Sequence, residues 1–282
     1  MHWFGEVAAD GNFHKAIVSG VMISVSPRMD MSFFHRNISM KYQSLFGKAF
    51  TESALPGNES GMFTGISLRP FDKWQVNAYT DLFSFPWLRF RADAPGKGAD
   101  HMIQIAWRPD KRSELVIRYR SESKPLNESH EFPELVPVKK TKQQLRLHFA
   151  SQLNPTTSFK SRVDLNWYNN KNVDAEHGFS GFVEVASRPS EKIKWNSRIH
   201  YFETDGYNSR LYAFESGVPY SFSIPAFYDR GMRYYLNLGY EPFDKLGVWI
   251  KLARTIFFEN QLSHSHISPN RSNLDIQVAY NF

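Results

Sequence analysis

Few residues of this chain have the types and spacing that a chemical site requires. His264 and His266 stand one residue apart and could offer two imidazoles to a metal ion. The chain has no cysteine and no carboxylate lies close to the pair, so we interpret both histidines as part of a solvated loop. Gly-rich phosphate loops, nucleophile elbows and helical metalloprotease motifs do not occur in the sequence. We therefore predict no catalytic residue, metal or cofactor, with a hydrolase that uses His148 as the alternative.

A larger set of polar residues recurs at every second position of strand-like segments. Because side chains alternate along a strand, these residues share one face, opposite a face of aliphatic and aromatic residues. A dry core could not hold so many charges, so we expect this face to line a polar lumen. Basic residues outnumber acidic ones, and an open pore should prefer anions. The alternative is an Arg–carboxylate network that braces the wall and conducts nothing. The nine residues expected in the lumen are Arg118, Arg120, Arg146, His148, Arg162, Asp164, Glu184, Arg198 and Arg233.

The segments that position these residues predict an all-β protein. About fourteen segments alternate apolar and polar residues and end in turn residues, and no helical periodicity is sustained over three turns. The clearest strands are 74–83, 102–108, 114–121, 144–153, 159–168, 179–186, 193–203, 232–240, 246–258 and 273–282.

Two kinds of connection alternate along the chain. Short turns that contain proline occur at 26–28, 69–73, 108–111, 154–156, 188–192 and 241–245. Long irregular segments occur at 43–61, 84–100, 122–140, 169–177, 205–231 and 259–272. Short periplasmic turns opposite long extracellular loops are typical of outer-membrane β-barrels. The pattern holds only if 210–215 forms a hairpin with 220–227 inside a long loop. A soluble β-sandwich, the alternative fold, has no reason to keep it.

The last ten residues and the composition agree with a barrel. Apolar and polar residues alternate to the C-terminus, where Tyr280 and Phe282 resemble the insertion signal that the barrel-assembly machinery reads. Aromatic residues make up 16% of the 282 residues, yet the mean hydropathy is -0.47, as expected when every second side chain faces lipid. No cationic and apolar leader precedes the first strand, so we expect the C-terminal part of a longer protein, with 1–282 as one barrel domain. The net charge of +6 suits lipopolysaccharide, nucleic acid or acidic solutes as partners, although the charges are dispersed.

Two of the long segments could contact a ligand outside the barrel. Segments 84–100 and 205–231 are rich in aromatic residues and arginine, which suits contacts with sugar or protein. A surface-binding module that the barrel only anchors is therefore the rival of a channel, unless the aromatic residues fold inward and close the mouth of the barrel. The residues expected to make contacts are Trp87, Arg89, Arg91, Tyr220, Phe227 and Tyr228.

Three segments resemble one group of bacterial proteins. FSFPWLRFRADAP at 83–95, RLYAFE with YSFSIPAFY at 210–228, and RNISMKYQSLFGKAF at 36–50 are similar to segments of large Bacteroidota outer-membrane proteins with an upstream helix-hairpin-helix, competence-protein-like region. The resemblance covers the barrel portion only. The helix-hairpin-helix region is absent here, so no DNA-binding residue is carried over, and nucleic acid is a partner only through this resemblance. The resemblance implies the outer membrane of a Gram-negative cell but no defined activity.

Together these observations predict an antiparallel transmembrane β-barrel of about fourteen visible strands, with more strands upstream. Its expected function is that of a porin-like channel or translocation scaffold with a basic polar lumen. The expected partners are outer-membrane lipid, lipopolysaccharide, the assembly machinery, and surface or periplasmic proteins.

Overall fold

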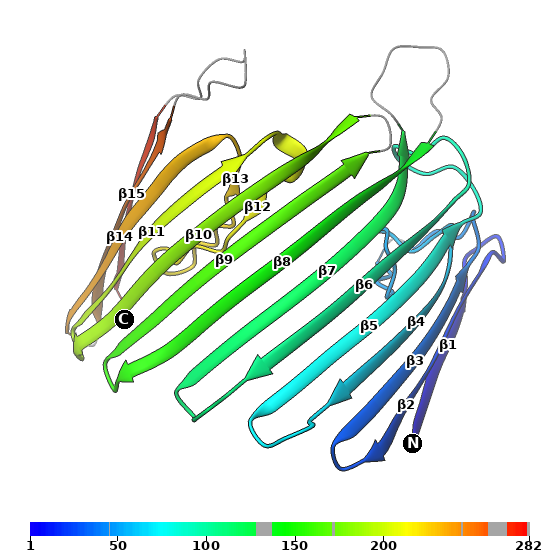
Figure 1. The fold of residues 1–282 in the computed structure, drawn as a ribbon, viewed down its shortest axis with the longest axis horizontal. Coiled ribbons are helices and arrows are strands. Elements are labelled where there is room, and N and C mark those ends of the chain that lie inside the picture. The colour runs from blue at the N-terminus through cyan, green and yellow to red at the C-terminus, as the bar shows by residue number, and fades with distance from the viewer. Residues whose placement is uncertain (45, 128–136, 171–172, 244, 259–269, 281–282) are drawn as a thin grey trace. The chain divides into compact units, whose positions relative to one another are not determined.

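The structure is a computed structural model, and it describes residues 1–44, 46–127, 137–170, 173–243, 245–258 and 270–280. One antiparallel sheet of 14 strands contains most of these residues, and a two-stranded hairpin forms a second sheet (Figure 1). In the large sheet each strand is hydrogen-bonded to its neighbours in chain order, except that β11 is followed by β14. The strands are β1 His2–Ala9, β2 Lys15–Ser26, β3 Met29–Ile38, β4 Glu59–Leu68, β5 Trp74–Phe85, β6 Gly96–Trp107, β7 Ser113–Asn127, β8 Pro137–Asn154, β9 Thr157–Asn170, β10 Val173–Ser190, β11 Ile193–Thr204, β12 Leu211–Tyr212, β13 Ala226–Phe227, β14 Arg230–Phe243, β15 Leu246–Phe257 and β16 Arg271–Tyr280.

Helices contribute almost nothing to the described part of the chain. The one helix there is a 3-10 turn at Tyr207–Ser209. Within the described residues, no helix has the length and apolar character needed to cross a membrane.

The connections follow the predicted alternation of short turns and long loops with one exception. The predicted long segment 169–177 is mostly strand, because β9 extends to Asn170 and β10 begins at Val173. Turns of two to five residues join β2 to β3, β4 to β5, β6 to β7, β8 to β9, β10 to β11 and β14 to β15. Because neighbouring strands are antiparallel, all six turns lie at the same ends of their strands (Figure 1). The long connections 39–58, 86–95 and 205–229 lie at the opposite ends. The hairpin predicted from 210–215 and 220–227 is also present, as β12 paired with β13 and a bridge between Glu215 and Ser223.

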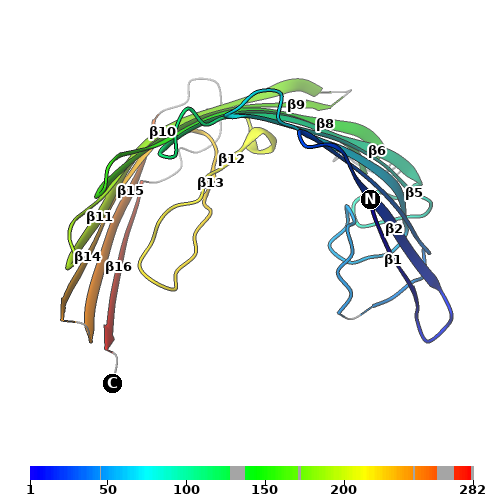
Figure 2. The ribbon, with the colours of Figure 1, turned by 90° about the horizontal axis from the view of Figure 1, so that it is seen from below.

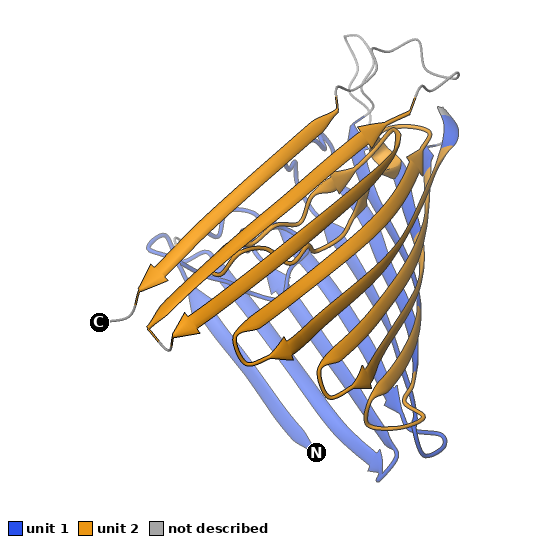
Figure 3. Cartoon of the chain, turned by 90° about the vertical axis from the view of Figure 1, so that its left-hand side faces the viewer, with its two compact units in different colours: residues 1–106, 118–143, 169–175 blue, residues 107–117, 144–168, 176–282 orange. Residues whose placement is uncertain are grey.

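The chain divides into two compact units (Figure 3). Unit 1 comprises 1–106, 118–143 and 169–175, and unit 2 comprises 107–117, 144–168 and 176–282. In unit 1, β1 to β5 pair in order. In unit 2, β10, β11, β14, β15 and β16 pair in order.

The strands have one apolar and one polar face, as their alternating sequences require. In unit 2 the register aligns Leu236, Leu252 and Leu274 on one face, called the apolar face below. These side chains have no protein cover: Leu252 is 52% and Leu274 is 59% exposed. So large an apolar surface marks a contact with another apolar medium. The opposite, polar face carries most of the charged residues that the protein buries.

Several strands extend further towards the long loops than the sequence pattern indicated. β8 begins at Pro137 rather than at 144, and β10 covers Val173–Ser190 rather than 179–186. The first part of β8 reads PVKKTKQQ, with polar residues on both faces. Backbone pairing continues there, although apolar and polar residues do not alternate as they do in the rest of the strand.

Candidate functional site

The polar face of unit 2 holds a network of charges centred on three carboxylates. Asp164 on β9 accepts a hydrogen bond from Arg146 Nε at 2.6 Å and another from Arg162 Nε. The Asp164 side chain is 1% exposed, so the two guanidinium groups replace the water that a carboxylate would otherwise bind.

The second carboxylate, Glu184 on β10, is equally well supplied. Arg198 Nε donates to it at 3.0 Å and the Tyr235 hydroxyl donates at 2.6 Å. Lys160 Nζ lies 3.6 Å from the other carboxylate oxygen and remains 48% exposed. Arg198 also lies 3.9 Å from the centre of the Phe182 ring, so an aromatic face contacts the same guanidinium.

The third carboxylate, Glu215, comes from the hairpin and not from the large sheet. Arg233 donates to it through Nε at 2.6 Å and Nη2 at 3.0 Å, and Lys251 donates at 3.3 Å. Arg233 also donates to Thr255 Oγ1 at 2.9 Å, and the Glu215 side chain is 0% exposed. The carboxylate therefore fixes the hairpin to β14 and β15.

Backbone carbonyls of the same loop make further bonds with the polar face. Arg162 Nη2 donates to Tyr212 O at 2.6 Å and Arg198 Nη1 donates to Phe214 O at 2.6 Å. Asn237 Nδ2 donates to Gly217 O at 2.8 Å. Figure 2 shows the loop that carries β12 and β13 on one side of the unit 2 strands.

We call these groups the basic network. Each of its three carboxylates is shared by two cations, so six cations face three anions. Within the basic network, cations therefore outnumber carboxylates by two to one. The cations are Arg146, Lys160, Arg162, Arg198, Arg233 and Lys251.

An aromatic cluster lies beside the basic network and includes one unusual histidine. Phe182, Phe202, Ala213 and Phe227 form the cluster, and Phe227 is contributed by the hairpin. His200 is 1% exposed, with its ring centre 4.2 Å from that of Phe227. Neither ring nitrogen of His200 has a hydrogen-bond partner among the described residues.

The polar face of unit 1 carries the opposite balance. Arg36, which is fully buried, donates to Glu59 at 2.6 Å and to Asp81 at 2.9 and 3.0 Å. Arg120 donates to Asp100 at 2.7 and 2.9 Å. Further carboxylates come from Glu52 and Glu122, which both lie within 2.8 Å of Lys124. Three cations thus face five carboxylates, and we call this set the acidic network.

The loops next to the acidic network are also partly buried. Burial raises the pKa of the Glu52 carboxyl above its usual value, although the ammonium group of Lys124 opposes the shift. In 86–95, burial lowers the pKa of Arg89, whose guanidinium lies 4.0 Å from the centre of the Phe85 ring and donates to Pro125 O at 2.7 Å. Asp10, in the connection from β1 to β2, is different. Desolvation would raise its pKa, but hydrogen bonds from the His14 ring and from the backbone amides of His14, Asn12 and Gln43 lower it to about 2.

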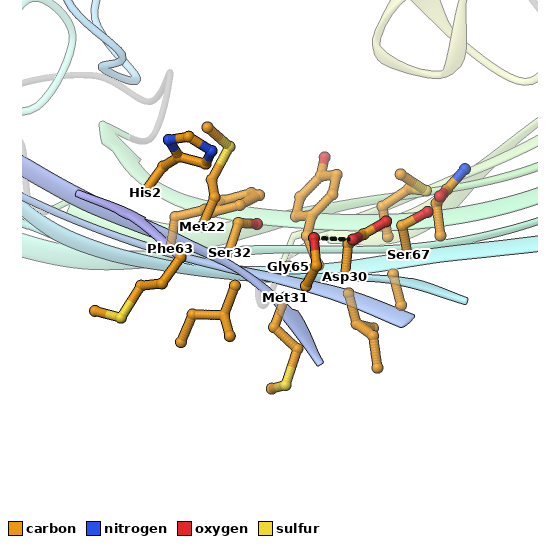
Figure 4. Close-up of a pocket in the computed structure, with 16 residues that line it drawn as sticks. His2, Met22, Asp30, Met31, Ser32, Phe63, Gly65 and Ser67 are labelled. Atoms are coloured by element: carbon orange, nitrogen blue, oxygen red, sulfur yellow. Dashed lines mark hydrogen bonds between the residues drawn. The ribbon is translucent and has the colours of Figure 1, made fainter. Parts of the chain in front are cut away.

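Unit 1 also has a hollow of about 500 Å³ on its polar face (Figure 4). His2, Met22 and Phe63 lie along it, and Ser24 donates to Asp30 at 2.7 Å within it. Its floor is at Gly65, where an added Cβ would lie 2.7 Å from Ser32 Oγ. The described residues contain no group of three or more His, Cys, Asp or Glu side chains able to hold a metal ion.

The structure places all nine residues expected in the lumen on the polar face. Seven of them belong to the networks above, and Arg118 and His148 lie half-buried on β7 and β8. Glu215, Arg36 and Asp81 also belong to these networks but were not predicted from the sequence. Asp81 on β5 lies at a polar position of the same period-2 alternation that identified Arg118. Nothing in the sequence indicates that Glu215 pairs with Arg233 and Lys251, which lie 18 and 36 residues further along the chain.

The residues expected to make loop contacts fall into two groups. Tyr220 and Trp87 are 98% and 55% exposed, and Arg91 is also exposed. Phe227 is 3% exposed and packs inward, whereas Arg89 and Tyr228 are half-buried. In the predicted insertion signal, Tyr280 lies on the apolar face at 56% exposure, and Phe282 lies outside the described residues. His264 and His266 also lie outside them.

Comparison with known proteins identifies the fold only. The sequence matches no protein-family model and no curated protein. Among solved structures, the copper transporter OprC aligns over 99% of this chain and 50% of its own, at 10% identity and a TM-score of 0.53. OmpT, an outer membrane protein of Vibrio cholerae, aligns over 99% of this chain and 93% of its own, at 9% identity and a TM-score of 0.45. A Pseudomonas aeruginosa FadL homologue aligns over 96% and 78% of the two chains, at 10% identity and a TM-score of 0.39. The likeness to OprC and the strand order together show that this chain has the antiparallel fold of transmembrane β-barrels.

Proposed function

We propose that this chain belongs to a barrel in a bacterial outer membrane and that the basic network lines a path for anionic solutes. The short turns would then face the periplasm and the long loops the exterior. The exposed apolar face supports the location, because lipid is the medium that such a surface requires.

The observation that carries the proposed passage is the sharing of carboxylates in unit 2. Six cations face three carboxylates, so pairing leaves positive charge within the basic network. A polar wall with surplus positive charge attracts anions and repels cations. A network that braces the wall and a path for anions are therefore compatible, because the same residues supply both.

Lys160 offers the sharpest test because it is the most exposed of the six cations. Its removal leaves Glu184 bonded to Arg198 and Tyr235, so the wall should fold normally. We expect Lys160→Gln to shift the reversal potential of the full-length protein in a planar bilayer towards cation selectivity under a KCl gradient. Lys160→Glu should shift it further in the same direction.

Lys111 is a suitable control, because it is an exposed lysine in the short turn between β6 and β7. Lys111→Gln should leave the reversal potential unchanged. Equal reversal potentials for the wild type, Lys160→Gln and Lys160→Glu would disprove the anion path.

One observation favours a second function, binding at the hairpin tip. Tyr220 and Phe222 are 98% and 77% exposed, although the rest of the hairpin is anchored to the polar face. Exposed aromatic side chains on a fixed support suit contacts with sugar or protein. The double variant Tyr220→Ser/Phe222→Ser would abolish cell-surface ligand capture with conductance unchanged if the tip is the functional part. Altered conductance with capture unchanged would reject this function.

A further inference from the structure

Arg254 on β15 is a charged residue on the apolar face. Cross-strand register places it beside Tyr234 on β14 and Ser272 on β16, in a row that continues to Ile199 on β11. The next row towards the short turns contains Leu236, Leu252 and Leu274. Apart from Ser272, the neighbours of Arg254 on this face of the sheet are thus aliphatic or aromatic.

Among the described residues, Arg254 has no hydrogen bond or ion pair. Its nearest counterpart on the same face, Arg230, differs in this respect. Arg230 Nε lies 3.3 Å from the Tyr201 hydroxyl and 3.8 Å from a Glu203 carboxylate oxygen. A cation that faces lipid is unfavourable unless an anion accompanies it, so Arg254 lacks the partner that its position requires.

Arg254 lies at the long-loop end of a groove on the apolar face. The groove encloses about 600 Å³ and is lined by Ile199, Leu236, Leu252 and Leu274. The small Ser197 also lines it, in register with Leu236, and leaves space where the neighbouring positions carry large side chains. An apolar groove with a single cation at one end matches an amphiphile that has acyl chains and an anionic headgroup.

The position of Arg254 along the strand indicates the leaflet. β15 runs from the short turn at Leu246 to the loop end at Phe257, so Arg254 lies three residues from the loop end. Apolar residues continue from the level of Leu252 towards the short turn, where acyl chains would lie. A phosphate at the level of Arg254 would therefore belong to the leaflet on the long-loop side.

We propose that Arg254 and this groove form a binding site for lipid A, the phosphorylated lipid of lipopolysaccharide. A lipid A phosphate accepts hydrogen bonds from the Arg254 guanidinium, and an acyl chain occupies the groove between Leu236, Leu252 and Leu274. This inference rests on the proposed outer-membrane location and adds a defined lipid site to it.

The test measures lipid A retained by the purified full-length protein in detergent, by native mass spectrometry. We expect Arg254→Gln to retain lipid A about tenfold less well than the wild type, because a charge-assisted hydrogen bond is lost. Arg254→Lys should retain part of the binding. Ser197→Leu, which fills the groove and keeps the cation, should also weaken retention.

The matched control is Arg230→Gln, which removes a paired arginine from the same face. Equal retention by the wild type, Arg254→Gln and Ser197→Leu would overturn the lipid site, and so would undiminished retention of lipid A that lacks its phosphates. Insertion into vesicles separates this result from the proposed location. Variants that insert normally but retain equal lipid A disprove the site alone, whereas failure of the wild type to insert into any vesicle disproves the location.

Discussion

At the scale of single residues, His200 is a buried polar side chain without hydrogen bonds, at a point where the hairpin covers the polar face. Its ring lies among Phe182, Phe202 and Phe227 and is almost fully buried, yet neither nitrogen is hydrogen-bonded within the described residues. A buried polar atom without a partner costs about 1–3 kcal/mol. An aromatic ring with no polar atom would fit the same contacts.

We expect His200→Phe to raise the free energy of unfolding by roughly 1–3 kcal/mol. The measurement is urea-induced unfolding from liposomes, followed by tryptophan fluorescence. His200→Ala is the companion variant, and it should lower stability because it removes the ring and leaves a cavity. Loss of stability in His200→Phe comparable to that in His200→Ala would show that the nitrogens matter and the ring packing does not.

The sequence could not predict this environment. Alternation places His200 on the same face as Arg198, where a histidine would be expected to meet water. Phe182 and Phe202 on the sheet supply part of the apolar surroundings, and Phe227, 27 residues further along the chain, completes them by docking over the ring.

At the scale of elements, the hairpin of β12 and β13 is the segment whose placement has the largest effect on the site. Its existence was predictable, because a strand-like segment at 210–215 would otherwise break the alternation of turns and loops. Its docking was not predictable, because the partners of Glu215 lie on two strands that the local sequence does not identify. The sequence therefore predicts the hairpin as an external loop element, and the tertiary contacts place it on the polar face.

The Glu215 contacts should control how firmly the hairpin is held. Glu215→Gln leaves the half-buried Arg233 and the buried Lys251 without their carboxylate, and loss of one partner from such a cluster costs roughly 3–5 kcal/mol. We expect chymotrypsin to cleave the variant faster at the exposed Tyr220 and single-channel conductance to increase as the hairpin leaves the polar face.

Glu241→Gln provides the comparison. Lys194 Nζ lies 2.7 Å from the Glu241 carboxylate, and the two side chains are 44% and 33% exposed. Loss of an exposed pair changes stability little, so cleavage and conductance should match the wild type. Identical cleavage rates for Glu215→Gln and the wild type would mean that other contacts hold the hairpin.

At the scale of the whole molecule, the proposed membrane barrel has a direct biochemical signature. Closed barrels keep every backbone group paired and resist detergent until they are heated. We expect the full-length protein from the outer-membrane fraction to migrate faster on a detergent gel when it is not boiled. Identical migration before and after boiling, with the protein in the soluble fraction, would instead indicate a soluble β-sandwich.

The strand order was the most predictable property at this scale. Period-2 alternation locates the strands, and the alternation of short turns with long loops indicates their order. The position and the order of the strands therefore both follow from local sequence. Strand length was less predictable. The first part of β8, where neither face is apolar, is held by pairing with its neighbours and has no local signal of its own.

The shared carboxylates of the basic network have a consequence for how this sequence can diverge. Replacement of one cation leaves its carboxylate with a second partner. Replacement of Asp164, Glu184 or Glu215 leaves two cations without their carboxylate. Mutational tolerance should therefore be unequal, with the acids more constrained than the exposed cation Lys160. Homologous proteins could then change the charge of the wall at exposed positions such as Lys160 while the three acids stay the same. The acids would then be the same in all homologues, whereas the basic residues would differ with the solutes that each homologue passes.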